Sequence, residues 1–362
     1  MDINLYCPIN QLGYGIASLN ITKALSNRGN DVFLHPIGNV EVPAEDKDLI
    51  VSKIKASLDY NRHATCLKIW HQNDLKTMIG KGQHIGFPFF ELDKFNETEV
   101  SSLQHLDKIF VTCEWAKEIL ENNNVIVPTY ITPLGVDRNL FNENLSFKEI
   151  FPSHKTATKF LAIGKWEVRK GHDVLLDIFC DTFKPEDDVM LIMNCFNPFI
   201  GPKGNQEWTD MYLNSPMKEK IAIINTRLQN QKNVAELIMN SDCGLFLSRA
   251  EGWNLELLEM MSCGKHVIAT NNTAHSAFAN NKNAMLTTLK IKESAYDGVF
   301  FKNQGNWATF EKQNFDEISQ HMLNVHKKKQ SGKLDINLAG IETAKFLSWD
   351  KTCENIERAI NA

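Results

Sequence analysis

Residues 243–270 constrain the fold of this chain more than any other segment. The apolar run CGLFLS is typical of a buried strand, and LELLEMM is a run of strong helix formers. Gly264 follows where a helix end favours a left-handed residue, and HVIAT indicates the next buried strand. This βαβ unit places Glu251 in the loop at the carboxyl end of a strand and Glu259 on the helix behind it. Open α/β sheets bind ligands at that edge, where a helix N-terminus presents free N–H groups.

Strands and helices alternate along the rest of the chain and form two series. Strands are expected at 3–9, 31–37, 65–70 and 84–90, and again at 159–166, 188–196 and 243–248. Residues 108–123 indicate a strand followed by a helix, and 127–137 close the first series. Further helices are expected over 15–29, near 45–58 and over 336–361. Residues 142–157 lose this periodicity and indicate a linker. The pattern predicts an α/β protein whose two Rossmann-like parallel-sheet domains face each other across a cleft. We expect an N-terminal domain over 1–145, a C-terminal domain over 158–335 and a final helical segment over 336–362.

Composition fits a two-domain globular protein. The chain has 362 residues, of which 43% are hydrophobic and 23% charged. It contains no apolar run near the roughly 18 residues of a membrane span, and its N-terminus lacks the pattern of a secretory signal. The eight cysteines are scattered and form no Cys-x-x-Cys pair, so they are expected to be reduced core residues. Together these features predict a cytoplasmic protein without an integral membrane segment.

The segment SRAEGWNLELLEMMSCGKHVIAT resembles the nucleotide-binding signature of retaining glycosyltransferases of family four, which have the GT-B fold. Two surface glutamates on a solvated helix are the simpler interpretation of the acids alone, but the whole motif favours the resemblance. The resemblance implies that Glu251 contacts the donor sugar and Glu259 holds the ribose. His266 departs from the family, which often has Pro there. The same resemblance implies that the donor site includes Arg249, Gly252, Trp253, Asn254 and Leu255.

The resemblance extends to residues 131–141 and 160–179 and to a closing helix that returns to the first domain. The family usually has Gly-Arg followed by Lys-Gly at the start of its nucleotide-binding domain, where this chain has Lys165 and Lys170. A departing diphosphate gains negative charge, which two cations stabilise. Lys in place of Arg keeps the charge at position 165 but loses the bidentate fork. A solvated turn is the alternative interpretation of Lys-Gly after a strand.

The first loop, NQLGYGIAS, carries Gly13 and Gly15 between a strand and a helix. This spacing also occurs in dinucleotide-binding motifs, but Ser18 occupies the third glycine position. The second strand ends without the acid that such a site needs for a ribose. The resemblance implies instead a glycine-rich loop that reaches the donor phosphates, and a plain tight turn remains the structural alternative.

Acceptor and metal candidates have weaker sequence support. Asp46 and Asp48 form an Asp-x-Asp string in a polar helix start, where a solvated first turn is the better interpretation. We therefore predict no catalytic metal and no cofactor besides the donor. His71 and Glu91 each follow an apolar strand and are candidates for acceptor binding. For His71, a half-buried structural histidine is the simpler alternative.

The resemblance implies a retaining, metal-independent hexosyl- or pentosyltransferase that uses a UDP- or GDP-sugar. No carboxylate is identifiable for a covalent intermediate. The resemblance implies instead that the departing phosphate assists the acceptor hydroxyl. One alternative is a phage-type enzyme that glycosylates a hydroxymethylated base in DNA, in the host cytoplasm. Another is a sugar-nucleotide or glycan-binding protein without catalysis.

The acceptor is left open between a glycan, a lipid-linked sugar and modified DNA. Residues 1–150 carry 14 basic and 19 acidic side chains, against 25 of each in residues 151–362. An acidic first half argues mildly against a basic membrane-binding or nucleic-acid-binding face there.

Overall fold

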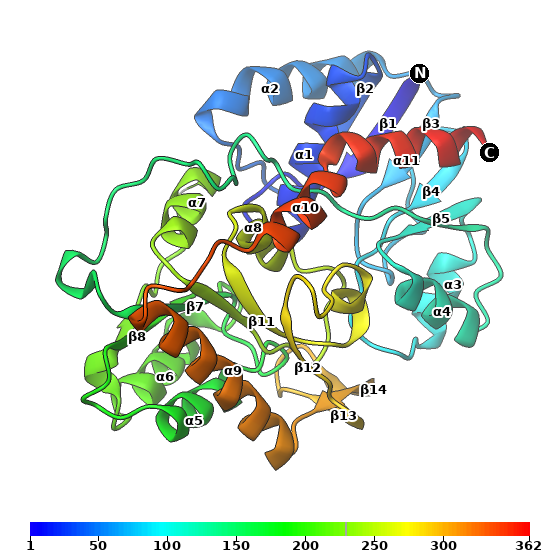
Figure 1. The fold of residues 1–362 in the computed structure, drawn as a ribbon. Coiled ribbons are helices and arrows are strands. Elements are labelled where there is room, and N and C mark those ends of the chain that lie inside the picture. The colour runs from blue at the N-terminus through cyan, green and yellow to red at the C-terminus, as the bar shows by residue number, and fades with distance from the viewer. Residues whose placement is uncertain (229) are drawn as a thin grey trace. The chain divides into compact units, whose positions relative to one another are not determined.

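The computed structural model describes residues 1–228 and 230–362, and the chain divides into two compact units (Figure 1). Met1–Asp137 and Phe346–Ala362 form the first unit, and Arg138–Lys345 form the second. Each unit contains a six-stranded parallel sheet with helices, as the alternation of strands and helices predicts. The domain limits expected at residues 145, 158 and 335 remain predictions.

The first unit is built on a sheet with the strand order β2-β1-β3-β4-β5-β6. Its strands are β1 (Asp2–Cys7), β2 (Asp31–Pro36), β3 (Thr65–Lys68), β4 (His84–Gly86), β5 (Lys108–Val111) and β6 (Thr129–Ile131). Its helices are α1 (Gly13–Asn27), α2 (Lys47–Ala56), α3 (Glu97–Leu103), α4 (Glu114–Asn122) and α11 (Trp349–Asn361). Short 3₁₀ turns, Ala44–Asp46 and Ser57–Asp59, flank α2. Helix α11 packs against α1, where Arg28 of the α1 C-cap pairs with Asp350 and Glu357.

Several predicted elements of this unit are longer than the observed ones. The strand expected over 84–90 ends at Gly86, because Pro88 follows and lacks the N–H that a ladder needs. The strand expected over 65–70 ends at Lys68. The prediction of a single last helix over 336–361 was wrong, because the segment forms two helices, α10 (Leu338–Phe346) and α11. Ser348 separates them because its hydroxyl caps α11 by accepting a hydrogen bond from the N–H of Lys351.

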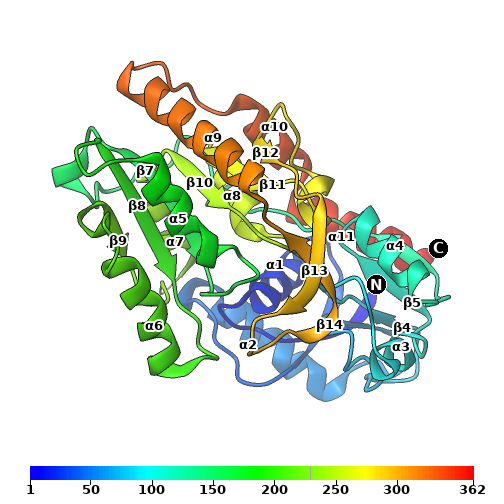
Figure 2. The same cartoon turned by 90° about the horizontal axis from the view of Figure 1, so that it is seen from below.

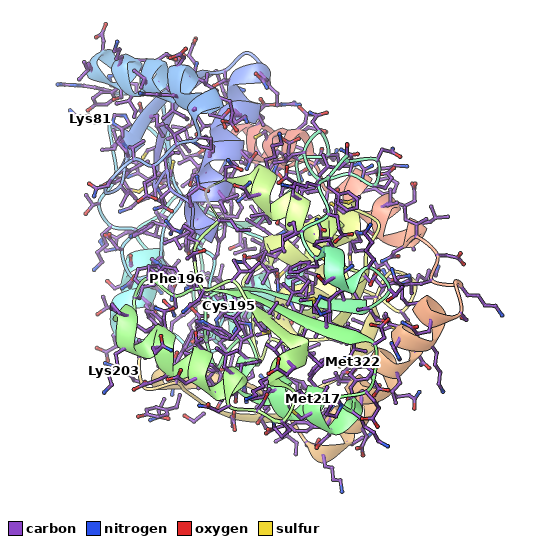
Figure 3. The ribbon with its side chains drawn as sticks, turned by 90° about the vertical axis from the view of Figure 1, so that its left-hand side faces the viewer. Lys81, Cys195, Phe196, Lys203, Met217 and Met322 are labelled. Carbon is purple, nitrogen blue, oxygen red and sulfur yellow. The ribbon has the colours of Figure 1, made fainter. Side chains whose placement is uncertain are left out.

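The second unit has a sheet with the order β12-β11-β10-β7-β8-β9. Its strands are β7 (Thr158–Gly164), β8 (Val189–Cys195), β9 (Ile221–Ile223), β10 (Cys243–Phe246), β11 (His266–Thr270) and β12 (Met285–Thr287). Its helices are α5 (His172–Thr182), α6 (Gly201–Leu213), α7 (Gln231–Met239), α8 (Leu255–Ser262) and α9 (Lys312–Gln330), together with most of α10 and the 3₁₀ turns Pro152–His154, Lys218–Lys220 and Thr273–Ala277. Met217 and Met322 (Figure 3) belong to the core between the sheet and α5 and α9.

An antiparallel hairpin that the sequence did not predict follows β12. It consists of β13 (Ile291–Tyr296) and β14 (Lys302–Thr309), and its pairing is irregular between Ser294 and Tyr296. Its β13 strand is mostly exposed, so the alternation of polar and apolar residues gave only a weak strand signal. The hairpin belongs to the second unit and leaves the sheet at its carboxyl edge.

All eight cysteines are free thiols, and all except Cys180 are buried. Burial raises the pKa of the Cys7 thiol to about 12, because the charged thiolate is disfavoured away from water. This agrees with their expected role as reduced core residues. In the part of the chain that the structure describes, no helix is long and apolar enough to cross a membrane.

Candidate active site at the carboxyl edge of the second sheet

The loops that follow β7 and β10 meet at the carboxyl edge of the second sheet. The N–H of Arg249 donates to the carbonyl of Arg169 over 2.7 Å, which ties the two loops together. Gly171 lies at the contact with φ of +74°, and a Cβ there would stand 2.1 Å from the carbonyl oxygen of Leu247. Only glycine combines this left-handed backbone with such a close approach. The Lys-Gly pair therefore fixes how the two loops pack.

Glu251 is buried in the β10 loop, and cations surround its carboxylate. Oε1 accepts hydrogen bonds from the hydroxyl of Ser248 at 2.7 Å and from Nζ of Lys170 at 3.0 Å. Oε2 pairs with the guanidinium of Arg169 at 2.7 Å. Burial alone would raise the pKa of Glu251, but Arg169 and Lys170 outweigh it and hold the pKa well below its usual range. Glu251 is thus a fixed anion at the sheet edge.

The β7 loop supplies the rest of this charge network. Glu167 pairs with Lys165 at 2.6 Å and with Arg169 at 2.7 Å, so Arg169 bridges Glu167 and Glu251. Burial opposes the charge of Glu167, yet the nearby cations, Arg169 foremost, lower its pKa. Both predicted lysines therefore lie at this edge, each beside a carboxylate. We name the set Lys165, Glu167, Arg169, Lys170 and Glu251 the charge network.

Helix α8 begins beside Glu251 and carries Glu259 on its buried side. Asn254 caps the helix with φ of +93°, and its side chain accepts a hydrogen bond from the N–H of Leu257. Asn254 Nδ2 also donates to Nε2 of His275 at 2.9 Å, while Nδ1 of His275 contacts the carbonyl of Thr270 at 3.0 Å. Burial lowers the pKa of His275, so the neutral ring suits both contacts. Gly264 ends the helix with φ of +70°, as predicted.

Glu259 differs from Glu251 in its surroundings. Its side chain is buried, and among the described residues its carboxylate makes no hydrogen bond or ion pair. Burial, with a smaller contribution from the charge of Glu256, raises the pKa of Glu259 well above its usual range. A buried carboxyl without a protein partner is destabilising, which favours a role toward a ligand.

The side chain of Arg249 contacts residues of its own unit, including residues at the base of the β13–β14 hairpin. Its guanidinium forms two bonds with the carboxylate of Asp173, at 2.7 and 2.8 Å, and another with the carbonyl of Val168. The same group lies 6.0 Å from the ring of Trp307 and 5.3 Å from that of Phe310. The donor-binding role expected for Arg249 remains a prediction, and its observed contacts organise the loop.

Three further predicted donor residues are buried around this loop. Gly252 and Leu255 flank the start of α8. Trp253 packs against Phe278 with a ring separation of 4.8 Å, and its indole N–H has no hydrogen-bond partner among the described residues. These residues are buried beneath the loop, and their contact with a donor remains a prediction.

In the first unit, the predicted residues lie at the carboxyl edge of its own sheet. Helix α1 starts at Gly13, and a Cβ on Gly15 would stand 2.4 Å from backbone atoms of Asn10, whereas Gly13 faces open space. The exposed ring of His71 packs 4.7 Å from that of Tyr14, and the charge of Glu91 acts on the Tyr14 hydroxyl. The acceptor roles of His71 and Glu91 remain predictions.

Asp46, the first member of the Asp-x-Asp string, differs from expectation. It is buried and pairs with Lys23 at 2.8 Å, so it is not a solvated first-turn residue, whereas Asp48 is exposed. Within residues 1–228 and 230–362, no three His, Cys, Asp or Glu side chains gather as a metal site would require.

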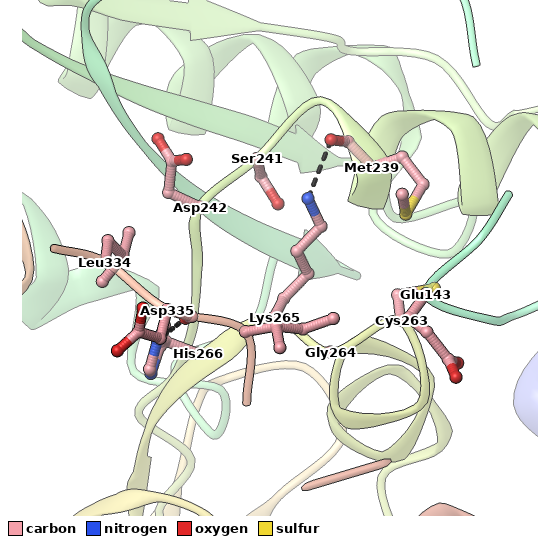
Figure 4. Close-up of a pocket in the computed structure, with 11 residues that line it drawn as sticks. Glu143, Met239, Ser241, Asp242, Cys263, Gly264, Lys265, His266, Leu334 and Asp335 are labelled. Carbon is pink, nitrogen blue, oxygen red and sulfur yellow. Dashed lines mark hydrogen bonds between the residues drawn. The ribbon is translucent and has the colours of Figure 1, made fainter. Parts of the chain in front are cut away.

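A pocket of about 210 Å³ lies elsewhere, at the amino ends of β10 and β11 (Figure 4). Nζ of Lys265 donates to the carbonyl of Met239 at 2.9 Å, and Nε2 of His266 contacts the carbonyl of Asp335 at 2.7 Å. Figure 4 shows both contacts as dashed lines. The residues that line this pocket are not those of the charge network, although Cys263, Gly264 and His266 belong to the end of the same sequence motif.

Sequence reasoning missed Glu167, Arg169, Asp173 and His275. Arg169 stands directly before Lys170, so the run EVRKG itself offered a third cation. Nothing in the sequence indicated that Glu167 would lie between two cations, because that contact depends on the path of the loop. His275 follows β11 by five residues and reaches Asn254 only through the fold.

Comparison with known proteins gives a family match over part of the second unit. Residues 157–297, which contain the charge network and α8, match the family model described as glycosyl transferases group 1. No curated protein sequence matches the chain.

Solved structures resemble the whole chain at low identity. Sucrose-phosphate synthase from Thermosynechococcus elongatus has a TM-score of 0.69 and 14% identity, covering 100% of this chain and 98% of that one. The Anabaena protein HepE, in complex with UDP-glucose, has a TM-score of 0.69 and 13% identity, and the match covers 100% of this chain and 99% of HepE. Trehalose-6-phosphate synthase OtsA has a TM-score of 0.69 and 9% identity, and the match covers 100% of this chain and 99% of OtsA. Residues 157–297 thus match the model of glycosyl transferases group 1, and the chain as a whole has the GT-B fold that these solved structures share.

Proposed function

We propose that the protein transfers a sugar from a nucleoside diphosphate to a hydroxyl group of an acceptor, with retention at the anomeric carbon. The observation that carries this proposal is the buried Glu251 carboxylate, held between Arg169 and Lys170 at a sheet edge. The carboxyl edge of a parallel sheet is where α/β folds bind nucleotides. The family match over residues 157–297 supports the same reaction class.

Lys165, Arg169 and Lys170 supply positive charge for the departing diphosphate. The three cations share two carboxylates, Glu167 and Glu251, so the ligand-free network keeps an excess positive charge. A diphosphate that gains charge as the sugar leaves would be stabilised by cations already held in place. Glu251 keeps Arg169 and Lys170 positioned and, in this proposal, accepts hydrogen bonds from the donor sugar.

Glu259 is the proposed partner of the ribose hydroxyls. Its carboxyl has no protein partner among the described residues, and two hydroxyl donors would satisfy it. UDP-glucose, the ligand named for the similar HepE structure, is the first donor to test, and GDP-sugars are the second.

In the proposed step, the acceptor oxygen forms a bond to the anomeric carbon as the bond to the diphosphate breaks. The acceptor proton passes to a departing phosphate oxygen, so the products are the glycoside and the nucleoside diphosphate. The protein contributes by positioning the substrates and by stabilising charge. No metal takes part in this scheme.

A panel of UDP- and GDP-sugars, assayed for release of the nucleoside diphosphate with and without a chelator, tests the proposal. Release with one donor, unaffected by the chelator, supports a metal-independent enzyme. NMR of the glycoside then reports whether the anomeric configuration is retained. Tight binding of a donor with no release under any acceptor would favour the non-catalytic binding protein instead.

A further inference from the structure

The tip of the β13–β14 hairpin exposes apolar side chains. Tyr296 is 58% exposed and Phe300 is 44% exposed, with Val299 exposed between them. The tip has a defined shape, because Oδ1 of Asp297 accepts hydrogen bonds from the N–H groups of Val299, Phe300 and Phe301. Large apolar side chains on a rigid, exposed tip favour contact with another molecule.

The tip reaches the loop between β8 and α6 at the carboxyl edge of the same sheet. The ring of Phe300 meets that of Phe199, which is 54% exposed, edge to face at 5.7 Å. Nζ of Lys165 lies 5.4 Å from both ring centres. Figure 2 shows the orange hairpin projecting from the β11–β12 side, and Figure 3 places Phe196 and Lys203 around that loop. The exposed aromatic pair is therefore continuous with the charge network.

The base of the hairpin is fixed to the β10 loop. The N–H of Ala308 donates to the carbonyl of Arg249 at 3.2 Å, and Arg249 Nε lies 3.5 Å from Glu293. Trp307 also donates to Glu293 at 3.0 Å. These contacts fix the position of the aromatic tip relative to the candidate active site.

The charges of the hairpin favour an anionic partner. Both acids of the hairpin have partners within the protein. Asp297 accepts hydrogen bonds from backbone N–H groups of the tip, and Glu293 lies beside Arg249 and accepts a hydrogen bond from Trp307. Lys290 and Lys302 are exposed, and neither forms an ion pair with a described residue. Exposed aromatic rings interleaved with lysines are typical of surfaces that stack unpaired bases and track a phosphate backbone.

We propose that Phe199, Tyr296 and Phe300 stack bases of single-stranded nucleic acid while Lys302 contacts its phosphates. The aromatic faces suit unpaired bases, since bases in a duplex already stack on one another. A membrane surface fits less well, because lipid around this tip would also desolvate the partly exposed ammonium of Lys165. If the proposed function holds, the bound strand is positioned as the acceptor.

Fluorescence anisotropy with a labelled single-stranded DNA of mixed sequence tests this inference. Phe199→Ser and Phe300→Ser should each weaken binding about tenfold or more, the effect of losing a stacked base. Lys302→Gln should weaken binding and reduce the slope of log K against log salt by about one. Phe147→Ser is the matched control, because Phe147 is equally exposed but lies in a segment tied to Asn240 before β10, at the amino edge.

Three results would overturn the inference. The first is that the wild type does not bind DNA at low salt. The second is that the tip variants bind DNA as well as the control does. The third is that the protein binds anionic phospholipid vesicles, that the tip variants lose this binding, and that DNA does not compete with it. UDP affinity, measured by calorimetry on the same proteins, is a separate readout. Wild-type DNA binding without binding of either UDP or GDP would reject the proposed function and leave the DNA surface standing. UDP binding without DNA binding would do the reverse.

Discussion

Nζ of Lys170 donates to Oε1 of Glu251 over 3.0 Å, and both side chains are buried. The resemblance assigned these residues to different parts of the donor, the diphosphate and the sugar. Because the two side chains contact each other, a change in one is expected to disturb the position of the other. Gly164, with φ of +138°, leaves room for the Lys170 side chain, since a Cβ there would stand 3.0 Å from its Cδ. A substitution of either member should therefore be tested together with the other.

Lys170→Met should reduce kcat more than it raises KM for the donor. The ammonium stabilises charge that develops as the diphosphate departs, so its loss should lower kcat by about 10²–10³-fold. Steady-state kinetics with the donor identified in the panel measure both parameters. Lys203→Met is the control, because Lys203 is 91% exposed and pairs only with Glu207 among the described residues. A wild-type kcat in Lys170→Met would reject this role.

Glu251→Ala should lose turnover and weaken binding of the nucleotide sugar more than binding of the bare nucleoside diphosphate. In the proposal Glu251 contacts the sugar, which the nucleoside diphosphate lacks. Calorimetry with UDP and with UDP-glucose separates these contributions. Equal losses for the two ligands would instead assign Glu251 a structural role, namely holding Arg169 and Lys170. A double-mutant cycle with Lys170→Met then measures their coupling.

Lys165→Arg should be tolerated or mildly beneficial. The longer planar group can keep the contact with Glu167 and add a second bond to a phosphate oxygen. A kcat/KM between that of the wild type and a few-fold above it is expected. A loss of tenfold or more would show that the guanidinium collides with the ring pair Phe199–Phe300 rather than reaching the donor.

The four central strands of the second sheet, β7, β8, β10 and β11, and Gly264 were predictable because their physical signals are local, whereas the short edge strands β9 and β12 were not predicted. Buried parallel strands are continuous apolar runs, and Gly264 follows a strong helix, so both appear in the sequence itself. Glu251 and Glu259 were predicted as a pair of site acids. The sequence did not distinguish their environments, since one lies among cations and the other has no protein partner.

The residues that were missed depend on contacts between distant loops. The sequence predicted Arg249 as a donor residue, which remains a prediction, but did not show that Asp173 and the hairpin contact it. Asp173 is 76 residues away in sequence, so no local pattern could reveal that pair. The hairpin was missed for a related reason, because its exposed strand has little apolar alternation. Tertiary contacts therefore decide which motif residues remain available to a ligand.

Gly13→Ala and Gly15→Ala should separate a functional glycine from a structural one. A Cβ at Gly13 meets nothing within 4 Å, so Gly13→Ala should leave thermal stability unchanged. A Cβ at Gly15 would collide with backbone atoms of Asn10 at 2.4 Å, so Gly15→Ala should destabilise by about 1–3 kcal/mol. If the loop approaches the donor phosphates, Gly13→Ala should still weaken donor binding. Unchanged donor affinity in Gly13→Ala would exclude that approach.

Glu259→Gln should stabilise the ligand-free protein and weaken nucleotide binding. The folded pKa of Glu259 lies above its ordinary value of 4.5, so the folded state favours the protonated form. The folded state therefore loses stability as pH rises from 4.5 through the raised pKa, and glutamine removes that loss.

Thermal melts should show no difference between Glu259→Gln and the wild type near pH 4. The variant should gain about 1–3 kcal/mol at pH values above the raised pKa. In the same variant, affinity for UDP should fall by about 1 kcal/mol, because a neutral amide accepts weaker hydrogen bonds from the ribose than a carboxylate does. Glu317→Gln is the control, since Glu317 is exposed on α9 of the same unit, whereas the charge of Glu256 itself acts on Glu259. A stability gain without any loss of UDP affinity would mean that Glu259 is a buried acid that no ribose contacts, and the donor orientation proposed here would then be wrong.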